Sequence, residues 1–420
     1  MTDNNENKVL NVPHLRFPKF SGEWEICKVS ELLDFYSTNS LSWEQLEYGE
    51  KAMMNLHYGL IHVGLPTMVD LRRDKLPNVK EGNMPKNFEL CKEGDVAFAD
   101  ASEDTNEVAK VIELFNLDNK DIVCGLHTIH GRDNKNKTIV GFKGYAFSSS
   151  AFHNQIRRIA QGTKIYSIST KNFSECYVGI PSKAEQTKIA TLLRLIDERI
   201  ATQNKIIEKY ESLIQAICDT LIEAEQHKVE LSFNDFGEPY SGLSSKSAED
   251  FGEGYQYITY MNVYQNQIID TTDVGLVKIN ETEQQSVVRY GDILFTLSSE
   301  TPNEVGMGAV YLGDTYPLYL NSFCFGVHII DESKIFPPFL AYYISTKSFR
   351  KAVFPLAQGS TRFNLQKNDF MKKMFLFPMV EKQNKIYTTL KAYSDKLSIE
   401  KHIAKLFCEQ KSFLLRQLFI

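Results

Sequence analysis

The chain has 420 residues, of which 43% are hydrophobic and 24% charged. This size and composition are typical of a globular protein with two or three domains and exclude disorder as the dominant state, apart from a polar leader at residues 2–8. The formal net charge of −6 argues against a protein that holds nucleic acid by charge alone.

No apolar run approaches the roughly 18 residues of a membrane span. The first residues, MTDNNENK, also lack the basic and then apolar layout of a signal peptide. We therefore expect a cytoplasmic protein without a membrane partner. The seven cysteines are dispersed and form no CxxC pair, so we expect buried, reduced thiols and no metal site.

The first 182 residues favour an irregular α+β module, rich in Tyr, Phe, Val, Ile, Gly and Asn, with a short helix at 149–159. This module recurs at an offset of 197 residues. Across 160–193, 10 of 34 positions are identical at that offset, where ordinary residue usage predicts roughly 2. Met54-Asn55 and Met261-Asn262 match at an offset of 207, which suggests loops of different length. The chain is therefore interpreted as a tandem duplication.

Each module leads into one long predicted helix, at 183–226 and at 380–420. Apolar residues recur there in alternating steps of four and three, the heptad pattern of a coiled coil. Pro181 precedes a capping box at the first helix start, and Pro378 marks the second. The predicted seam residues are Ile189, Leu193, Ile196, Ile200, Ile207, Ile214, Ile217, Ile386, Leu390, Leu397, Phe407 and Leu414.

The two predicted helices carry formal charges of −2 and +4, which favours an intramolecular antiparallel pair. The alternative is two unrelated amphipathic helices, each docked on its own module. We predict an α+β fold with an internal pseudo-two-fold repeat, in which two similar α/β modules are separated by a long antiparallel two-helix coiled coil. Its core, from 189 to 221, would be ~48 Å long.

The order of a module followed by a long helix, repeated twice, resembles that of the specificity (S) subunit of type I restriction–modification enzymes. The resemblance covers residues 15–420 and depends on the order, doubling and spacing of several short pieces. The matching pieces are Gly94-Asp95, Gly291-Asp292, Gly359-Ser360-Thr361, PSKAEQTKI from Pro181 and PMVEKQNKI from Pro378.

The resemblance implies target-recognition domains at 1–182 and 227–379, with spacer helices at 183–226 and 380–420. Each domain would read one half of a bipartite, asymmetric site in double-stranded DNA. The helices would set the length of the unread spacer and dock two methyltransferase (M) subunits, and through them restriction (R) subunits. S-adenosylmethionine, ATP and Mg²⁺ are expected in those partners and not in this chain.

The sequence also lacks catalytic motifs, so we expect no enzyme. There is no GxxxxGK[ST] loop for ATP. Phe336-Pro337-Pro338-Phe339 superficially resembles the Asn/Asp-Pro-Pro-aromatic motif of amino-methyltransferases, but Phe336 replaces the amide or carboxylate that would hold the amino group. Two prolines that open a helix are the simpler explanation.

Basic residues gather in corresponding parts of both copies, at 157–171 and 347–373. Cations and turns with free backbone N–H groups contact phosphate, and an arginine can also read guanine. The alternative is a solvated basic face. The predicted DNA contacts are Arg157, Arg158, Thr163, Lys164, Lys347, Arg350, Lys351, Ser360, Thr361 and Arg362.

The helix charges leave −8 on the two modules and the leader. We therefore expect weak DNA binding by the chain alone and tight binding only with M subunits, which supply further cations. The alternative function is a two-headed coiled-coil scaffold for other proteins without DNA binding. Such a scaffold would not need basic turns at matching places in both modules.

Three further features remain open. The segment 133–137 has no counterpart in the second copy, which suits either a base-reading element or an ordinary loop. The repeated Ser-Glu…Asn-Glu-Val pattern at 102–108 and 299–305 favours scaffold or backbone contact over base reading. His127 and His328 align at an offset of 201 and are interpreted as structural histidines.

Overall fold

The computed structural model describes residues 10–49 and 53–420, so the predicted polar leader lies outside the described residues. The chain divides into two compact units. Unit 1 comprises Met1–Gln203 and Ile403–Ile420, and unit 2 comprises Asn204–His402. None of the helices in the described part of the chain combines the length and the apolar stretch that a membrane span requires.

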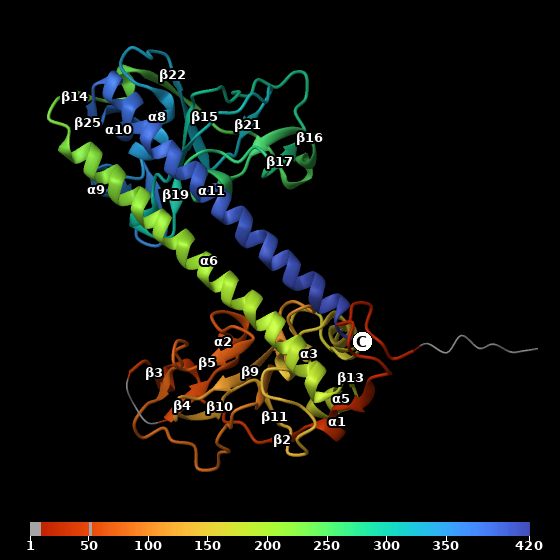
Figure 1. Ribbon diagram of the computed structural model, residues 1–420. Coiled ribbons are helices and arrows are strands. Elements are labelled where there is room, and N and C mark those ends of the chain that lie inside the picture. The colour runs from red at the N-terminus through yellow and green to blue at the C-terminus, as the bar shows by residue number, and fades with distance from the viewer. Residues whose placement is uncertain (1–9, 50–52) are drawn as a thin grey trace, which may run out of the picture. The chain divides into compact units, whose positions relative to one another are not determined.

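Unit 1 is built from short strands and helices that lead into one long helix (Figure 1). Its strands are β1 (Glu25–Lys28), β2 (Asp34–Tyr36), β3 (Leu46–Glu47), β4 (Met53–Leu56), β5 (Met68–Asp70), β6 (Asn78–Val79), β7 (Val96–Ala99), β8 (Ala101–Ser102), β9 (Val111–Asn116), β10 (Asp121–Cys124), β11 (Thr128–Arg132), β12 (Tyr166–Ser167) and β13 (Tyr177–Ile180). Its helices are α1 (Val29–Leu32), α2 (Tyr58–His62), α3 (Lys143–Phe147), α4 (Ser150–Ile159), α5 (Thr170–Ser174) and the first half of α6 (Lys183–Ala224).

Unit 2 has the same kind of construction. Its strands are β14 (Lys228–Leu231), β15 (Gly237–Ser241), β16 (Phe251–Ile258), β17 (Val274–Val277), β18 (Ile293–Thr296), β19 (Ser298–Ser299), β20 (Gly308–Val310), β21 (Tyr319–Leu320), β22 (Cys324–Ile329), β23 (Ala357–Gln358), β24 (Phe363–Leu365) and β25 (Phe375–Pro378). Its helices are α7 (Tyr260–Gln265), α8 (Pro337–Tyr343), α9 (Lys347–Val353), α10 (Lys367–Lys372) and the first part of α11 (Val380–Gln417).

The sheet topology of unit 1 recurs in unit 2. The strand order β2-β11-β7-β9 recurs as β15-β22-β18-β20, and the antiparallel ribbon β1–β13 recurs as β14–β25. The parallel pair β4–β10 recurs as β16–β21. The predicted α+β fold with an internal repeat is confirmed.

One predicted match between the copies is wrong. Met54 lies in a strand, whereas Met261 lies in a helix, so their dipeptides match by chance. The equivalent helices start at Tyr58 and Tyr260, an offset of 202. The loops between the copies therefore differ by fewer residues than the dipeptide match suggested.

The core of each unit takes side chains from both long helices. In unit 1, Ile189 and Leu193 of α6 belong to the same buried cluster as Leu414 and Leu418 near the other end of the chain. In unit 2, Ile214 of α6 shares a cluster with Ile386 and Leu390 of α11. The alternative in which each helix docks only on its own module is therefore wrong.

Ion pairs show the direction of the two helices. In unit 1, Asp197 of α6 pairs with Lys411 of α11 at 2.6 Å. In unit 2, Glu211 pairs with Lys401 at 2.7 Å, and Glu225, just beyond α6, lies 3.6 Å from Lys382. Residue numbers rise along one helix as they fall along the other, so the helices are antiparallel within each unit, as predicted (Figure 1).

The predicted seam serves more than the pairing of the helices. All of its residues are buried or half-buried, but most also pack against the globular cores. Only Ile207 and Phe407, near the middle of their helices, lie outside those clusters. The heptad spacing thus reflects docking of the helix ends on the units together with contact between the helices.

A buried glutamine fastens the start of each long helix to its unit. Gln186 Nε2 donates to the carbonyls of Pro181 and Lys137, and its Oε1 accepts from the Ile139 amide at 2.9 Å. Gln383 Nε2 donates to Pro378 O at 2.8 Å and to Lys334 O, and its Oε1 accepts from Phe336 N at 2.8 Å. Both side chains are fully buried, which gives the shared Gln-x-x-Ile motif a structural role.

We predict that Gln383→Leu destabilises unit 2 by about 1–3 kcal/mol or more. The apolar side chain would leave the Phe336 amide and the Pro378 carbonyl buried without their partner. Chemical denaturation followed by circular dichroism measures the loss. The control is Lys385→Ala on the exposed face of the same helix, which should change stability by less than about 0.5 kcal/mol. Equal stability of Gln383→Leu and the natural chain would contradict this role.

Candidate nucleic-acid interface

A glycine turn closes a short hairpin at the equivalent place in each unit. Gly162 and Gly359 have φ values of +137° and +142°, which residues other than glycine rarely adopt. A Cβ on Gly162 would lie 1.9 Å from the Ile165 carbonyl oxygen, and one on Gly359 would lie 2.0 Å from that of Arg362. The chain doubles back sharply at both turns and exposes the residues that follow.

The strand that carries each Ser-Glu motif holds the turn in place. In unit 1, β8 pairs with β12 directly after the turn, and Ser102 lies opposite Tyr166. In unit 2, β24 pairs with both β19 and β23, and Ser299 lies opposite Phe363. This pairing explains why the Ser-Glu motif is repeated, and it agrees with the scaffold role expected of it.

Nine of the ten predicted contact residues are exposed, Arg350 being the exception. Lys164 and Arg362 lie in the turns themselves, and Arg158 and Lys351 belong to α4 and α9, which lead toward them. Within residues 10–49 and 53–420, no carboxylate forms an ion pair with any of these four cations. Each turn therefore lies in a surface with unneutralised positive charge.

Arg350 has a different role from the one predicted. Its guanidinium donates to the carbonyls of Asn303, Val305 and Gly306 at 2.7–2.8 Å. Burial lowers the pKa of Arg350. This arginine thus fixes the Asn-Glu-Val loop from inside and does not face an external ligand. In unit 1, Arg157 is exposed and donates to the Asn106 side chain at 2.8 Å, on the equivalent loop.

A cavity of about 310 Å³ lies beside the turn of unit 2. Glu304 accepts hydrogen bonds there from Thr301 Oγ1 and Tyr264 Oη at 2.7 and 2.8 Å, and these bonds lower the pKa of its carboxyl. The lining residues are Tyr260, Met261, Tyr264, Ser298, Ser299, Glu300, Glu304, Phe323 and Arg362. The cavity offers a cation, carboxylates and aromatic faces to a ligand.

Unit 1 has a cavity of about 710 Å³ in the equivalent place, between α2, the Ser-Glu motif and the turn. Its chemistry differs, because Ile165 stands where unit 2 has Arg362. Glu107 pairs with Lys110 at 2.7 Å. The lining residues are Tyr58, His62, Val63, Ala101, Ser102, Glu103, Asp104, Glu107, Lys110, His127 and Ile165.

The tyrosines of these cavities were not among the residues predicted from the sequence. Tyr58 and Tyr260 are equivalent and begin α2 and α7. Their offset of 202 departs from 197 because the connecting loops differ in length, so the main repeat does not align them. The helix N-caps that precede them, His57 and Thr259, were the available signal.

The segment 133–137 is tied to the body of unit 1. Asn134 Nδ2 donates to Asp34 Oδ2 and Tyr36 Oη, both at 2.7 Å. Lys135 donates to a backbone carbonyl, and Lys137 pairs with Glu25 at 2.6 Å. These bonds occupy its polar side chains and favour the ordinary-loop interpretation over base reading.

The Gly-Asp pieces anchor the central strands. Asp95 accepts from Arg132 Nη2 at 2.8 Å, and Asp292 accepts from His328 Nδ1 at 2.9 Å. Arg132 lies over the Tyr36 ring just as His328 stacks on Tyr240. His328 is therefore equivalent to Arg132 and not to His127, because β11 and β22 pair with their neighbours in that register.

A family model described as the type I restriction modification DNA specificity domain matches residues 74–212 and again residues 233–406. Together the two matches cover well over half of the chain. The chain belongs to this family. The double match of this DNA specificity family follows the internal repeat seen in the fold.

The chain is also similar to individual proteins. The chain is 25% identical over 287 residues to the type I restriction enzyme EcoKI specificity subunit of Escherichia coli strain K12, a match that spans 63% of this chain and 60% of that protein. The S subunit of a type I restriction–modification system from M. genitalium has 18% identity and a TM-score of 0.52, with 97% of this chain and 99% of that chain covered.

A second solved structure concerns complex assembly and conformational transition of the type I R-M system. It has 14% identity and a TM-score of 0.56, and covers 93% of this chain and 96% of that chain. At identities this low, the similarity to these two structures shows a shared fold and nothing further.

We predict that replacing Arg350 and replacing Arg362 have different effects on the stability of unit 2. Arg350→Met should cost about 1.5–3 kcal/mol, because it removes charged hydrogen bonds to buried carbonyls. Arg362→Ala should change stability by less than about 0.5 kcal/mol, as expected of an exposed side chain that has no hydrogen-bond or ion-pair partner among the described residues. Chemical denaturation of both variants measures this difference, and similar losses in both would contradict the assigned roles.

Proposed function

We propose that this chain is the DNA-sequence-specificity subunit of a type I restriction–modification complex, without a catalytic role of its own. Each unit reads one half of a bipartite, asymmetric site in double-stranded DNA. The observation that carries the proposal is the pair of equivalent exposed turns, each beside a cavity whose lining differs between the units. Two domains that read different DNA sequences would share one backbone fold and differ in the side chains that contact the bases.

The turns and the helices before them supply the contacts to the DNA backbone. Lys164, Arg158 and Lys351 are exposed cations without ion-pair partners among the described residues. Thr163, Ser360 and Thr361 add hydroxyls and backbone N–H groups on the same turns. Such contacts position a protein on DNA without reading its sequence.

The cavities supply the contacts that distinguish bases. Arg362 can donate two hydrogen bonds to guanine. In unit 1, Ile165 stands in the place of Arg362 and offers an apolar contact, and His62 stands in the place of Tyr264. Because the scaffolds match and these side chains do not, the two half-sites should differ.

The long helices supply the docking surface for two M subunits, through which R subunits join. Both helices expose large apolar side chains, which mark interaction surfaces when they are grouped. These are Leu195, Leu213, Tyr393, Ile399, Leu406 and Phe413. S-adenosylmethionine, ATP and Mg²⁺ act in the partner subunits under this proposal, and the complex works on DNA in the cytoplasm.

Duplex binding by the chain with its M subunits tests the proposal. We expect tight, sequence-specific binding by the complex and roughly 100-fold weaker binding by the chain alone, since its domains carry net negative charge. Fluorescence anisotropy with duplexes selected from a random library measures both. Sequence-specific nanomolar binding by the chain alone would contradict the charge argument, and no binding in either case would favour the protein scaffold.

Two variants separate base reading from backbone contact. Arg362→Ala should weaken binding of the selected site by about 1–3 kcal/mol and relax the preference in one half-site only. Lys164→Ala should weaken binding to all sequences alike and reduce the slope of log affinity against log salt by about 1. Lys86→Ala, exposed but outside both turns and cavities, is the control and should leave binding unchanged.

A further inference from the structure

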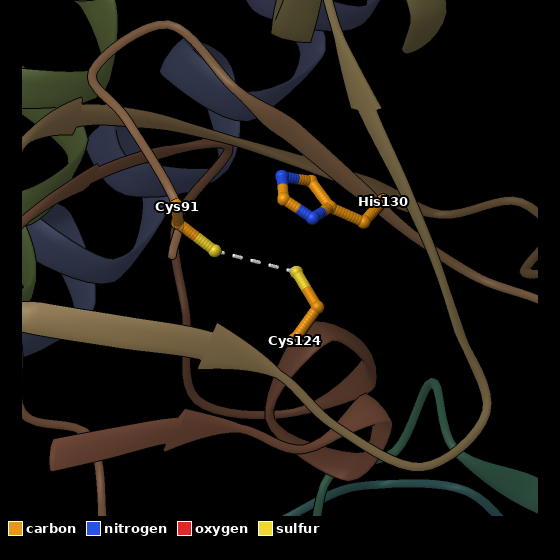
Figure 2. A group of neighbouring side chains, drawn as sticks. All are labelled: Cys91, Cys124 and His130. Carbon is orange, nitrogen blue, oxygen red and sulfur yellow. Dashed lines mark hydrogen bonds between the residues drawn. The ribbon is translucent and has the colours of Figure 1, made fainter. Parts of the chain in front are cut away.

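Unit 1 contains a buried cluster of two thiols and one imidazole that plays no part in the proposed DNA contacts. The side chains of Cys91, Cys124 and His130 come from the segment before β7, from the end of β10 and from β11 (Figure 2). Their ligand atoms all lie within 4.8 Å of one another. Cys91 Sγ and Cys124 Sγ are 3.6 Å apart.

The imidazole has a free acceptor directed at this cluster. His130 Nε2 donates a hydrogen bond to Asp95 Oδ2 at 2.8 Å, so Nε2 carries the proton in the neutral ring. His130 Nδ1 is buried and has no hydrogen-bond partner among the described residues, and the residue as a whole is 1% exposed. A buried polar atom without a partner costs free energy and calls for an explanation. Figure 2 shows one ring nitrogen on the side of Cys124.

We propose that Cys91, Cys124 and His130 bind a zinc ion. Two cysteine sulfurs and one histidine nitrogen are ligands that zinc prefers. Zinc–sulfur bonds of about 2.3 Å in tetrahedral geometry place two ligand sulfurs about 3.8 Å apart, close to the 3.6 Å seen here. Asp95 orients the imidazole through its other nitrogen, as carboxylates do behind metal-bound histidines.

The charges around the cluster suit a divalent cation. Two thiolates neutralise zinc, while Asp95 is already paired with Arg132 at 2.8 Å. Neither the zinc ion nor the Asp95 carboxylate is then left unpaired in the interior, where an unpaired charge is strongly disfavoured. The imidazole can stay neutral, which is the form that binds metal.

Unit 2 provides an internal comparison, because it has replaced all three ligands. Backbone pairing puts Val288 in the place of Cys91 and Leu320 in that of Cys124. The place of His130 is taken by Gly326, against which the Tyr240 ring packs. The same position in the fold is thus filled in unit 2 by Val288, Leu320 and the Tyr240 side chain, and in unit 1 by metal-binding groups.

The ion would hold together two sheets of unit 1. Cys124 belongs to the sheet β10-β4-β6-β3 and His130 to the sheet β2-β11-β7-β9-β5. Cys91 adds the segment that leads to the Gly-Asp turn. The ion would have a structural role because it links these parts of unit 1. Three protein ligands leave the fourth tetrahedral position to a water molecule.

Metal analysis of the purified full chain tests the proposal. After refolding or purification with zinc under reducing conditions and exhaustive dialysis, we expect one zinc per chain by elemental mass spectrometry. Cobalt in place of zinc should give the absorption bands of tetrahedral cobalt bound by thiolate. Chelation of the zinc should lower the thermal stability of the chain.

The matched variant carries Cys91→Val and Cys124→Leu, the residues that unit 2 uses at these places. It should fold, bind no zinc and lack the cobalt bands. Cys176→Ala, which removes another buried thiol, should keep one zinc. Absence of stoichiometric zinc in the natural chain, a Cys91–Cys124 disulfide under the same conditions, or zinc retained by the double variant would overturn the proposal. None of these outcomes depends on DNA binding.

Discussion

The structure depends on one constraint: the core of each unit is closed by side chains from both long helices. Ile189 and Leu414 meet in the core of unit 1, and Ile214 and Leu390 meet in that of unit 2. The buried Gln186 and Gln383 fix where the helices leave the units. Neither half of the duplication can therefore complete its core without the other half of the chain, which couples the two units through shared helices.

The two units share one backbone architecture but present different surfaces. Backbone features that set the turns are alike, including the positive φ of Gly162 and Gly359 and the Ser-Glu strand beside them. The exposed side chains next to these features differ, with Ile165 in one unit and Arg362 in the other. Under the proposed function, a new DNA specificity would then need new side chains and not a new fold.

Much of this architecture could be predicted from the sequence because it is local or periodic. The offset of 197 places the starts of α6 and α11, and the heptad pattern predicts their buried faces. Arg350 could not be separated from its exposed neighbours, because its carbonyl partners lie more than 40 residues away. The cluster of Cys91, Cys124 and His130 could not be predicted for the same reason, because sheet pairing and not sequence spacing brings these residues together.

The central claim is that two units read two separate parts of one DNA site. Sequencing of the bases methylated by the chain together with its M subunits, on DNA of random sequence, tests this claim most directly. The account predicts a split motif, with two specified parts separated by a stretch of fixed length in which any base is allowed. A single continuous motif, or methylation without sequence preference, would contradict it.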